Sequence, residues 1–362
     1  MNGGRKRNMK AAVLKEYRNF IIDDVPKPRI SENQVLVRSE YAGICGSDMH
    51  IFNGDFHPRT QVPFIPGHEF AGTIVETGSN VKSFKTGDMV AVDPIIWCGK
   101  CAACQLGHYP ACTSLKLLGV DLDGGFGEYV AANENMLYKL EPHIPAKHAA
   151  LVEVYSIGFH ACNRAGLKKD DTAVIWGTGR IGQSVLQAAR TITSNKIICI
   201  DIIDSRLENA KRAYTDIVTV NLLKEDPISV IKESTDGRGV DVAFEVVGHA
   251  ESISNQPNPV AGCIKSIRGA GTVCVLGLGD NPSPILMKEL IWKEAKIIAS
   301  RVSHGEFRKA IDNLNAGKLK PESLISAEFE LAYIQNAFEL IKEAPEKYLK
   351  ILLKITQSDP DY

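Results

Sequence analysis

The sequence contains no run of eighteen or more apolar residues, so it predicts no helix that spans a bilayer. It also lacks an excess of either charge, because 42 lysines and arginines oppose 43 aspartates and glutamates. That balance argues against a protein that mainly binds nucleic acid or an anionic membrane. The basic start, MNGGRKRN, is not followed by the apolar segment of a secretory signal. We therefore expect a cytoplasmic location and a flexible extension over residues 1–8.

The length of 362 residues favours two domains, and the pattern of the sequence changes near residue 155. Before that point, short apolar runs separated by glycine and proline are typical of a β-rich domain. After it, apolar strands alternate with helix-like stretches, which predicts βαβ units and a parallel sheet. The expected strands here are 172–176, 196–201, 240–247, 272–278 and 295–299, and the expected helices are 183–190 and 206–213. In the tail we expect helices over 306–314 and 334–341 and a strand over 349–355.

Four of the nine cysteines lie in one loop, with the spacing Cys98-x2-Cys101-x2-Cys104-x7-Cys112. Disulfide frameworks belong to small secreted chains, whereas a tight cluster in a cytosolic chain more often holds a metal. Four thiolates at this spacing can surround one tetrahedral zinc ion. Such a closed site stabilises its loop and leaves no coordination position for catalysis.

Other uses of this loop fit less well. Ferredoxin-type iron–sulfur motifs close with a three-residue gap and a Cys-Pro pair, whereas Thr113 follows Cys112. A redox pair does not need four cysteines, and a nucleic-acid zinc knuckle would have more basic neighbours than Lys100. Several other cysteines lie in or near apolar runs and are expected to pack in the core; they are Cys162, Cys199, Cys263 and Cys274.

The motif GTGRIG at 177–182 follows a predicted strand and begins a predicted helix, which is the context of a dinucleotide-binding fingerprint. Gly177 permits the tight turn, Gly179 lets the backbone approach a pyrophosphate, and Gly182 lets the helix pack on the strand. The phosphates would lie at the positive end of the helix, near Arg180 and Ile181. A glycine-rich turn in some other doubly wound domain is the alternative interpretation.

About twenty residues beyond this motif, Asp201 ends the next predicted strand. A carboxylate there accepts hydrogen bonds from the adenosine ribose and repels a 2′-phosphate, which favours NAD over NADP. Arg206 is a counter-indication, because a nearby arginine can pair with that phosphate. We expect it instead beside the adenine or on Asp201 itself.

A third group of residues is dispersed along the first half of the chain. Cys45 begins the string CGSDMH, His68 and Glu69 lie in PGHEF, and Glu153 lies in an apolar run. Each alone is weak, because a single cysteine or histidine is more often an ordinary core or surface residue. Together, a thiolate, an imidazole and two carboxylates suit a zinc ion with an exchangeable fourth position.

The strings GICGSDMH, PGHEFAG, the four-cysteine loop, DGGFGEYV and GTGRIG follow one another along nearly the whole chain. In this order they resemble the medium-chain, zinc-dependent alcohol and polyol dehydrogenases. The sorbitol, threonine and butanediol dehydrogenase group is the most similar, because a glutamate follows His68 and residue 153 is glutamate, not cysteine. The resemblance implies an α/β fold: a GroES-like β-rich catalytic domain (1–155), a Rossmann NAD-binding domain with a doubly wound parallel sheet (156–299), and a tail (300–362) that returns to the catalytic domain.

The resemblance also implies the ligands of a catalytic zinc. Cys45 and His68 would be fixed ligands, and Asp48 would orient His68. Glu69 and Glu153 would compete for, or share, the remaining protein position, and the sequence does not select between them. The two zinc sites together imply two zinc ions per chain.

By the same resemblance, Ser47 and His50 match the positions of a proton relay, which would carry the alcohol proton by way of the nicotinamide ribose towards solvent. The backbone of Leu276, Gly277 and Leu278 would lie beside the nicotinamide. The zinc would act as a Lewis acid on the substrate oxygen while hydride passes to NAD. The implied activity is oxidation of a secondary alcohol, such as a polyol or sugar alcohol, by a homodimer or homotetramer.

Three other functions stay open at this point. An L-threonine 3-dehydrogenase has the same motifs, but it needs a carboxylate-binding group that we do not find in the sequence. A zincless quinone or enone reductase on the same fold is disfavoured by the retained Cys45, His68 and Glu69. A non-catalytic protein would have lost relay or ligand positions, and none is lost here.

Two sets of residues carry weaker expectations. Phe52, Phe56 and Phe64 lie between His50 and His68 and either shape a substrate pocket or pack in the core. Seven other histidines lack ligand-like spacing and are expected to be ordinary; they are His57, His108, His143, His148, His160, His249 and His304.

Overall fold

The computed structural model describes residues 8–248 and 256–356, and the chain forms two compact units. Among the described residues, the first unit comprises 8–153 and 325–356, and the second comprises 154–248 and 256–324. Within the described ranges, no helix has the length and apolar character needed to cross a bilayer. The extension expected over residues 1–8 lies outside the described residues except for Asn8, which begins strand β1 (Asn8–Glu16).

The second boundary differs from the division expected from the sequence, because residues 300–324 belong to the second unit. This segment contains helix α10 (Glu306–Asn315), which contacts helix α4 (Val152–Ala165). The buried Glu306 carboxylate lies 3.0 Å from Nδ1 of His160 and accepts a hydrogen bond of 3.0 Å from Asn163. These polar contacts hold α10 within the second unit.

The first unit is built on a seven-stranded sheet of order β16-β17-β3-β4-β5-β9, with β8 paired to β3. Its strands are β3 (Gln34–Gly43), β4 (Glu69–Thr77), β5 (Met89–Val92), β8 (Tyr129–Asn133), β9 (Leu137–Lys139), β16 (Ile325–Glu330) and β17 (Lys350–Lys354). Central strand β3 is buried along nearly its whole length rather than on alternate residues, because other elements cover both of its faces. Two smaller sheets pair β1 with β2 (Asn19–Pro26) and β6 (Ile95–Ile96) with β7 (Lys116–Leu117).

The last strand brings the end of the chain back to the first unit. Strand β17 pairs antiparallel with β3, and Leu352 lies opposite Gly43. Gly43 ends β3, and helix α1 (Gly46–Asn53) begins three residues later. Its described part also contains the α-helices α2 (Ala102–Gln105), α3 (Ala146–Ala149) and α11 (Ile334–Glu343).

An aromatic cluster fixes α1 against the rest of the first unit. The ring of Phe52 lies 5.7 Å from that of Phe20 and 5.0 Å from that of Phe338, between ring centroids. Phe52 is 2% exposed. Of the two interpretations of Phe52 open from the sequence, the structure therefore shows core packing.

The second unit contains a six-stranded parallel sheet of order β12-β11-β10-β13-β14-β15. Its strands are β10 (Ala173–Trp176), β11 (Ile197–Asp201), β12 (Val218–Asn221), β13 (Val240–Glu245), β14 (Ile267–Val275) and β15 (Lys296–Ala299). Numbered along the chain within this sheet, the order is 3-2-1-4-5-6, the order of the Rossmann fold. The strand order reverses between β10 and β13, and in such sheets ligands bind at the carboxyl ends of the strands near this reversal.

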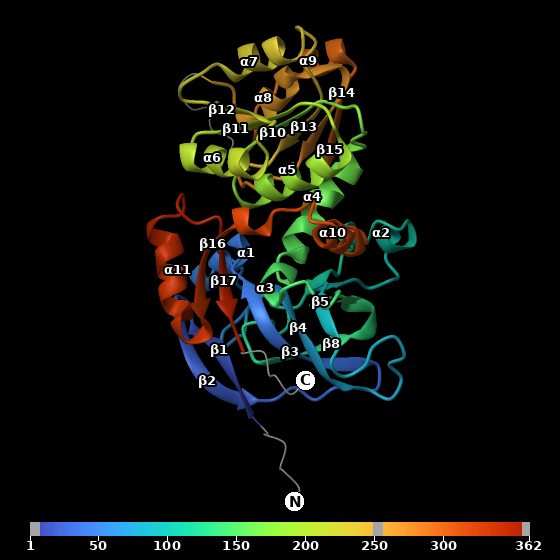
Figure 1. Ribbon diagram of the computed structural model, residues 1–362, viewed down its shortest axis with the longest axis vertical. Coiled ribbons are helices and arrows are strands. Elements are labelled where there is room, and N and C mark those ends of the chain that lie inside the picture. The colour runs from blue at the N-terminus through green and yellow to red at the C-terminus, as the bar shows by residue number, and fades with distance from the viewer. Residues whose placement is uncertain (1–7, 249–255, 357–362) are drawn as a thin grey trace, which may run out of the picture. The chain divides into compact units, whose positions relative to one another are not determined.

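Helices cover both faces of this parallel sheet (Figure 1). They are α5 (Arg180–Ile192) and α6 (Asp204–Ala213) on one face, and α7 (Pro227–Ser234), α8 (Pro259–Ser266) and α9 (Met287–Lys293) on the other. Because both faces are covered, every side chain of β10 and β11 is buried, and all but Asp201 at the end of β11 are apolar. The structure confirms the α/β class with a parallel, doubly wound sheet.

Candidate metal centres and cofactor site

One buried carboxylate connects two of the residues expected to bind a catalytic zinc. Oδ2 of Asp48 accepts the backbone N–H of Cys45, the N-cap of α1, at 2.8 Å. Oδ1 of the same carboxylate lies 3.5 Å from Nδ1 of His68. Asp48 thus fixes the backbone at Cys45 and faces one nitrogen of the His68 ring, which leaves Nε2 for another partner.

The donor atoms of Cys45, His68 and Glu69 converge on one point. One ligand atom from each of the three lies within 4.8 Å of the others. His68 is 5% exposed and Glu69 is fully buried. Oγ of Ser47 lies 3.3 Å from Nε2 of His68, so the relay serine predicted from the sequence borders this group.

Neighbouring charges shift the pKa values of the converging side chains. Burial and the Glu69 carboxylate act to raise the pKa of the Cys45 thiol, but His68 and Lys350 outweigh them and hold it below its usual value. Burial acts to lower the pKa of His68, but Asp48 and Cys45 raise it well above its usual value. Zinc binds a deprotonated thiol and a neutral imidazole, so binding of the metal displaces any proton that these two groups hold. Thiolate, imidazole and carboxylate donors are also the ligand types that zinc prefers, so these residues fit the metal.

Glu153 lies near this group but outside it. Its side chain is 4% exposed in the first turn of α4 and is not among the three that converge. Burial and the charge of Glu69 raise the pKa of Glu153 well above its usual value. The structure thus separates the two glutamates that the sequence left equivalent: Glu69 contributes to the converging donors, and Glu153 interacts with them electrostatically.

Lys350 is a residue of this site that the sequence did not single out. Its Nζ donates to both carboxylate oxygens of Glu69, at 2.7 and 2.6 Å, and to the carbonyl oxygen of Ile44 at 3.2 Å. The side chain is 1% exposed. The available signal was a lysine inside the apolar run LKILL at 349–353, where a charged residue needs a buried partner.

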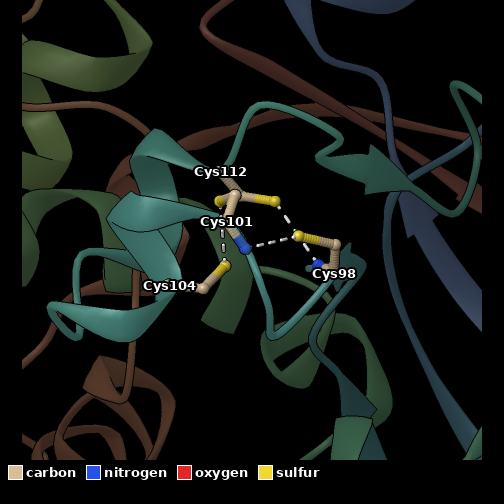
Figure 2. A group of neighbouring side chains, drawn as sticks. All are labelled: Cys98, Cys101, Cys104 and Cys112. Carbon is tan, nitrogen blue, oxygen red and sulfur yellow. Dashed lines mark hydrogen bonds between the residues drawn. The ribbon is translucent and has the colours of Figure 1, made fainter.

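The four clustered cysteines form a separate lobe of the first unit, closed at its base where β6 pairs with β7. Figure 2 shows their side chains pointing towards one another, and their sulfur atoms lie within 4.8 Å of one another. The Cys101 and Cys104 sulfurs are 3.6 Å apart, and Sγ of Cys98 accepts the Cys101 N–H at 3.4 Å. Within the described chain this is the second group of converging metal-ligand side chains.

The local surroundings lower the pKa of one of these thiols and raise the pKa of another. Backbone hydrogen bonds, led by the N–H of Cys104, lower the pKa of Cys101 to about 6. Burial raises the pKa of Cys104 to about 12. Four thiolates this close cannot all be charged without a cation among them, and tetrahedral zinc with four cysteine ligands is the ordinary solution. The lobe fits a structural zinc.

The glycine-rich loop of the second unit has the backbone that its motif predicts. Gly177 has a φ of +96°, which favours glycine, and a Cβ on Gly182 would lie 1.9 Å from the Gly177 carbonyl oxygen. A Cβ on Gly179 would meet only Arg206, at 3.8 Å. The loop is therefore tightly packed on its inner side and open at Gly179, as the approach of a pyrophosphate requires.

Asp201 has a structural role that the sequence did not predict. Its Oδ2 accepts the N–H and Oγ1–H of Thr178, at 2.7 and 3.0 Å. Its Oδ1 accepts the N–H groups of Ile202 and Ile203, at 2.8 and 3.0 Å. Nη1 of Arg206 lies 3.7 Å away, in agreement with the expected place of that arginine on Asp201. Asp201 thus anchors the glycine-rich loop to the end of β11.

The segment 276–278 follows β14 at the carboxyl edge of the parallel sheet. The N–H groups of Leu276 and Gly277 donate to the carbonyl oxygen of Glu245, which ends β13, at 2.9 and 3.1 Å. The Leu278 side chain is 94% exposed. The segment lies at the edge where ligands bind in such sheets.

The remaining cysteines and histidines have local roles. The four cysteines expected in the core are all buried: Cys162, Cys199, Cys263 and Cys274. His57 hydrogen-bonds to Tyr17, and His249 lies outside the described residues. His50 is 60% exposed, and its Nδ1 lies 2.9 Å from Oδ2 of Asp55.

Comparison with known proteins decides the family. The profile of the alcohol dehydrogenase GroES-like domain matches residues 31–142, and that of the zinc-binding dehydrogenases matches residues 181–316. An uncharacterised zinc-type alcohol dehydrogenase-like protein of Haemophilus influenzae is 35% identical over 96% of this chain and 98% of its own. The chain belongs to the zinc-type, medium-chain alcohol dehydrogenase family.

Within this family, relatives named for different substrates have similar sequence identity to this chain. Sorbitol dehydrogenase of Bacillus subtilis is 32% identical, covering 96% of this chain and 97% of its own. L-Threonine 3-dehydrogenase of Bacillus velezensis is 31% identical, covering 92% of this chain and 95% of its own. The zinc-type alcohol dehydrogenase family thus assigns this chain to the oxidoreductases, without selecting an alcohol.

Solved structures of the family share the whole fold. The Escherichia coli CFT073 alcohol dehydrogenase rspB, complexed with NADH, has a TM-score of 0.86 at 29% identity, covering 96% of this chain and all of its own. A zinc-binding dehydrogenase from Sinorhizobium meliloti 1021, bound to NADP, has a TM-score of 0.85 at 26% identity, covering 96% of this chain and 99% of its own. The choice between the two nicotinamide cofactors therefore rests on this chain's own residues.

Proposed function

We propose that this protein is an NAD-dependent zinc dehydrogenase that oxidises a secondary alcohol of a polyol, sugar alcohol or related hydroxy compound. The observation that carries the proposal is the convergence of Cys45, His68 and Glu69 within 4.8 Å in a chain of this family. When bound there, zinc supplies Lewis-acid polarisation of a substrate oxygen, which makes an alkoxide accessible near neutral pH. A small-molecule alcohol, with its ketone, is the partner that such a site takes.

The protein's own residues have distinct roles in this proposal. Cys45 and His68 hold the metal, and Glu69 and Glu153 provide carboxylates for its exchangeable position. Asp48 lies 3.5 Å from Nδ1 of His68 and would orient the ring so that Nε2 is available to the metal. Ser47, next to His68, accepts the alcohol proton, and His50 passes it to solvent.

NAD is the proposed cofactor, held at the glycine-rich loop by Gly177, Gly179 and the N-terminus of α5, which begins with Arg180 and Ile181. Asp201 supports NAD because a buried carboxylate at the end of β11 repels a 2′-phosphate. The backbone of residues 276–278 is proposed to face the nicotinamide. Cys98, Cys101, Cys104 and Cys112 hold the second, structural zinc.

We also propose a homodimer that forms through β15. This strand is at the edge of the parallel sheet, its Ile297 side chain is 40% exposed, and Trp292 of the preceding helix is 77% exposed. An exposed edge strand with apolar neighbours is a template for pairing with another strand, and an antiparallel pair of β15 strands satisfies a two-fold axis. A cytoplasmic location is part of the proposal, because reduced thiols persist there.

The proposal is tested by metal analysis and by a substrate panel. Purified protein is expected to hold two zinc ions per chain and to reduce NAD, followed by NADH absorbance, with one or more polyols, sugars, sugar phosphates or short diols. L-Threonine is included because the threonine 3-dehydrogenase relative supports it as a second candidate. A protein that holds two zinc ions but reduces neither NAD nor NADP with any secondary alcohol would contradict the proposal.

A further inference from the structure

We propose that Asp55 is a positioning residue for His50, which holds the hydrogen on Nδ1 of the imidazole so that Nε2 is the atom that accepts the relayed proton. The inference rests on the proposed function, because it assigns a partner to the relay histidine. Asp55 was not singled out in the sequence.

The backbone places Asp55 beside His50 through the end of α1. Gly54 is the C-cap of this helix with a φ of +90°, and a Cβ there would lie 3.0 Å from the Tyr17 ring. This left-handed turn brings the N–H of Asp55 to 2.9 Å from the carbonyl oxygen of His50. The Asp55 side chain therefore starts from a fixed backbone, and its Oδ2 lies 2.9 Å from Nδ1 of His50.

A second contact fixes the plane of the same ring. The imidazole of His50 stacks on Phe56 with ring centroids 5.8 Å apart and planes 4° from parallel. Asp55 contacts Nδ1, and Phe56 stacks on one face of the ring. Nε2 is therefore the ring nitrogen that neither of these two contacts occupies. The sequence left two interpretations of Phe56, a substrate pocket or the core. The structure instead shows it stacked on the relay histidine.

The neighbouring charges do not compete for His50. The Arg59 guanidinium lies 6.0 Å from the Phe56 ring, but both of its contacting nitrogens donate to the Asp121 carboxylate, at 2.8 and 2.7 Å. The next histidine, His57, hydrogen-bonds to Tyr17. Asp55 is therefore the carboxylate that faces His50 within this unit.

The chemistry of the step follows from which nitrogen holds hydrogen. A neutral imidazole has one N–H donor and one acceptor nitrogen, and the bond made by one nitrogen selects the role of the other. With Nδ1–H donated to ionised Asp55, the proton released by the alcohol binds Nε2 and forms an imidazolium. The imidazolium then loses the Nε2 proton to water, and Asp55 remains ionised throughout. No electron is exchanged in this step.

The alternative is an exposed ion pair without a role, since His50 and Asp55 are 60% and 53% exposed and such pairs contribute little to stability. Three variants of the full chain distinguish the two cases. Asp55→Ala removes the acceptor, Asp55→Asn keeps a carbonyl acceptor without the charge, and Asp24→Ala is the matched control. Asp24 is 57% exposed and pairs with Lys10, so its loss tests the general cost of removing an exposed ion pair.

The first measurement is the tautomer of His50, from the nitrogen chemical shifts of its ring in labelled protein at high pH. Wild type and Asp24→Ala are expected to hold hydrogen on Nδ1, Asp55→Ala to move it largely to Nε2, and Asp55→Asn to keep it largely on Nδ1. A wild-type ring with hydrogen on Nε2, or an Asp55→Ala ring unchanged from wild type, overturns the inference whatever the activity.

The second measurement separates this inference from the proposed function. For the alcohol found in the panel, Asp55→Ala is expected to lower kcat by up to about tenfold with KM unchanged, less than the roughly 10²–10⁴-fold of losing a general base in His50→Asn. Asp55→Asn is expected to recover most of the lost kcat. An active wild type whose kcat is unchanged in Asp55→Ala contradicts the positioning role alone, whereas a wild type that oxidises no alcohol contradicts the proposed function.

Discussion

Nζ of Lys350 donates to both carboxylate oxygens of Glu69, at 2.7 and 2.6 Å, although the two residues belong to opposite ends of the chain. Lys350 is 1% exposed and Glu69 is fully buried, so neither charge has water as an alternative partner. Removing one member of a buried pair leaves the other charge uncompensated, which is the most costly outcome for such pairs.

We therefore expect Lys350→Met to lower the free energy of unfolding by about 3–5 kcal/mol, measured by denaturant titration. Adding Glu69→Gln to Lys350→Met is expected to restore part of this loss, because the unpaired charge is then gone. The control is Lys354→Met on the same strand as Lys350, which breaks a more exposed pair with Glu330 of β16 and should cost less than about 1 kcal/mol. Equal costs at the two lysines would contradict a stabilising ion pair at Glu69.

Glu306 gives the second unit a defined dependence of stability on pH. Burial acts to raise the pKa of Glu306, but the hydrogen bond with His160 outweighs it and holds the pKa below its ordinary value of 4.5. A lowered carboxyl pKa stabilises the fold above pH 4.5, and this contribution is lost as the pH falls below that value. Glu306→Gln is expected to be less stable than wild type at neutral pH, and the difference should shrink towards acid pH. Unfolding at several pH values measures this, with the exposed Glu208→Gln as control.

We expect that the zinc ion of the four-cysteine lobe can be removed while the zinc ion at Cys45 and His68 stays bound. Cys104→Ser is expected to reduce the zinc content from two ions per chain to one, because the buried Cys104 completes the tetrahedral set. Cys45→Ser is the reciprocal variant and should lose the other ion. Metal content by mass spectrometry, together with proteolysis of the loop between β6 and β7, measures both effects. Two zinc ions retained in Cys104→Ser would contradict the structural site.

Asp201→Ser should change the cofactor preference and loosen the glycine-rich loop. Loss of a charge-assisted hydrogen bond to the ribose corresponds to about ten- to hundredfold in kcat/KM for NAD, with relative gain for NADP. Thr178 also loses its acceptor, so faster amide exchange at Thr178 is expected. Asp204→Ser, which breaks an exposed pair with Lys224 near the same strand, is the control. A wild type that already prefers NADP would contradict the role given to Asp201.

The oligomeric state tests the exposed edge of the parallel sheet. Ile297→Lys places a charge on β15 and is expected to convert the proposed dimer into a monomer of 39.6 kDa, measured by light scattering. Ile22→Lys is a matched control, because Ile22 lies on strand β2 with 38% exposure against 40% for Ile297. If Ile297→Lys remained a dimer, the dimer interface would not lie at β15, and the proposed interface would be contradicted.

The parallel sheet was predictable because its buried strands are continuous apolar runs. The expected strands at 172–176 and 196–201 agree with β10 and β11 to within one residue at each end. Strand β12 was missed because two of the four residues in VTVN are polar, so no run stands out. Strand β14 begins at Ile267, five residues before the expected start, because glycines interrupt its first half.

The site was predictable only where its residues belong to contiguous motifs. The family resemblance brought Cys45, His68 and Glu69 together, and the structure places their donor atoms in one group. Lys350 could not be assigned to Glu69, because their contact depends on β17 pairing with β3 across 281 residues. Asp55 could not be assigned to His50 without the left-handed turn at Gly54.

The pairing of β17 with β3 also sets the order in which this protein is completed during translation. A thiol, an imidazole and a carboxylate leave the ribosome early, whereas the ammonium group that matches the carboxylate emerges 281 residues later. Until then the nascent polypeptide exposes a metal-binding set whose negative charge is unmatched. The Glu69 carboxylate therefore gains its buried counter-charge only when β17 joins β3.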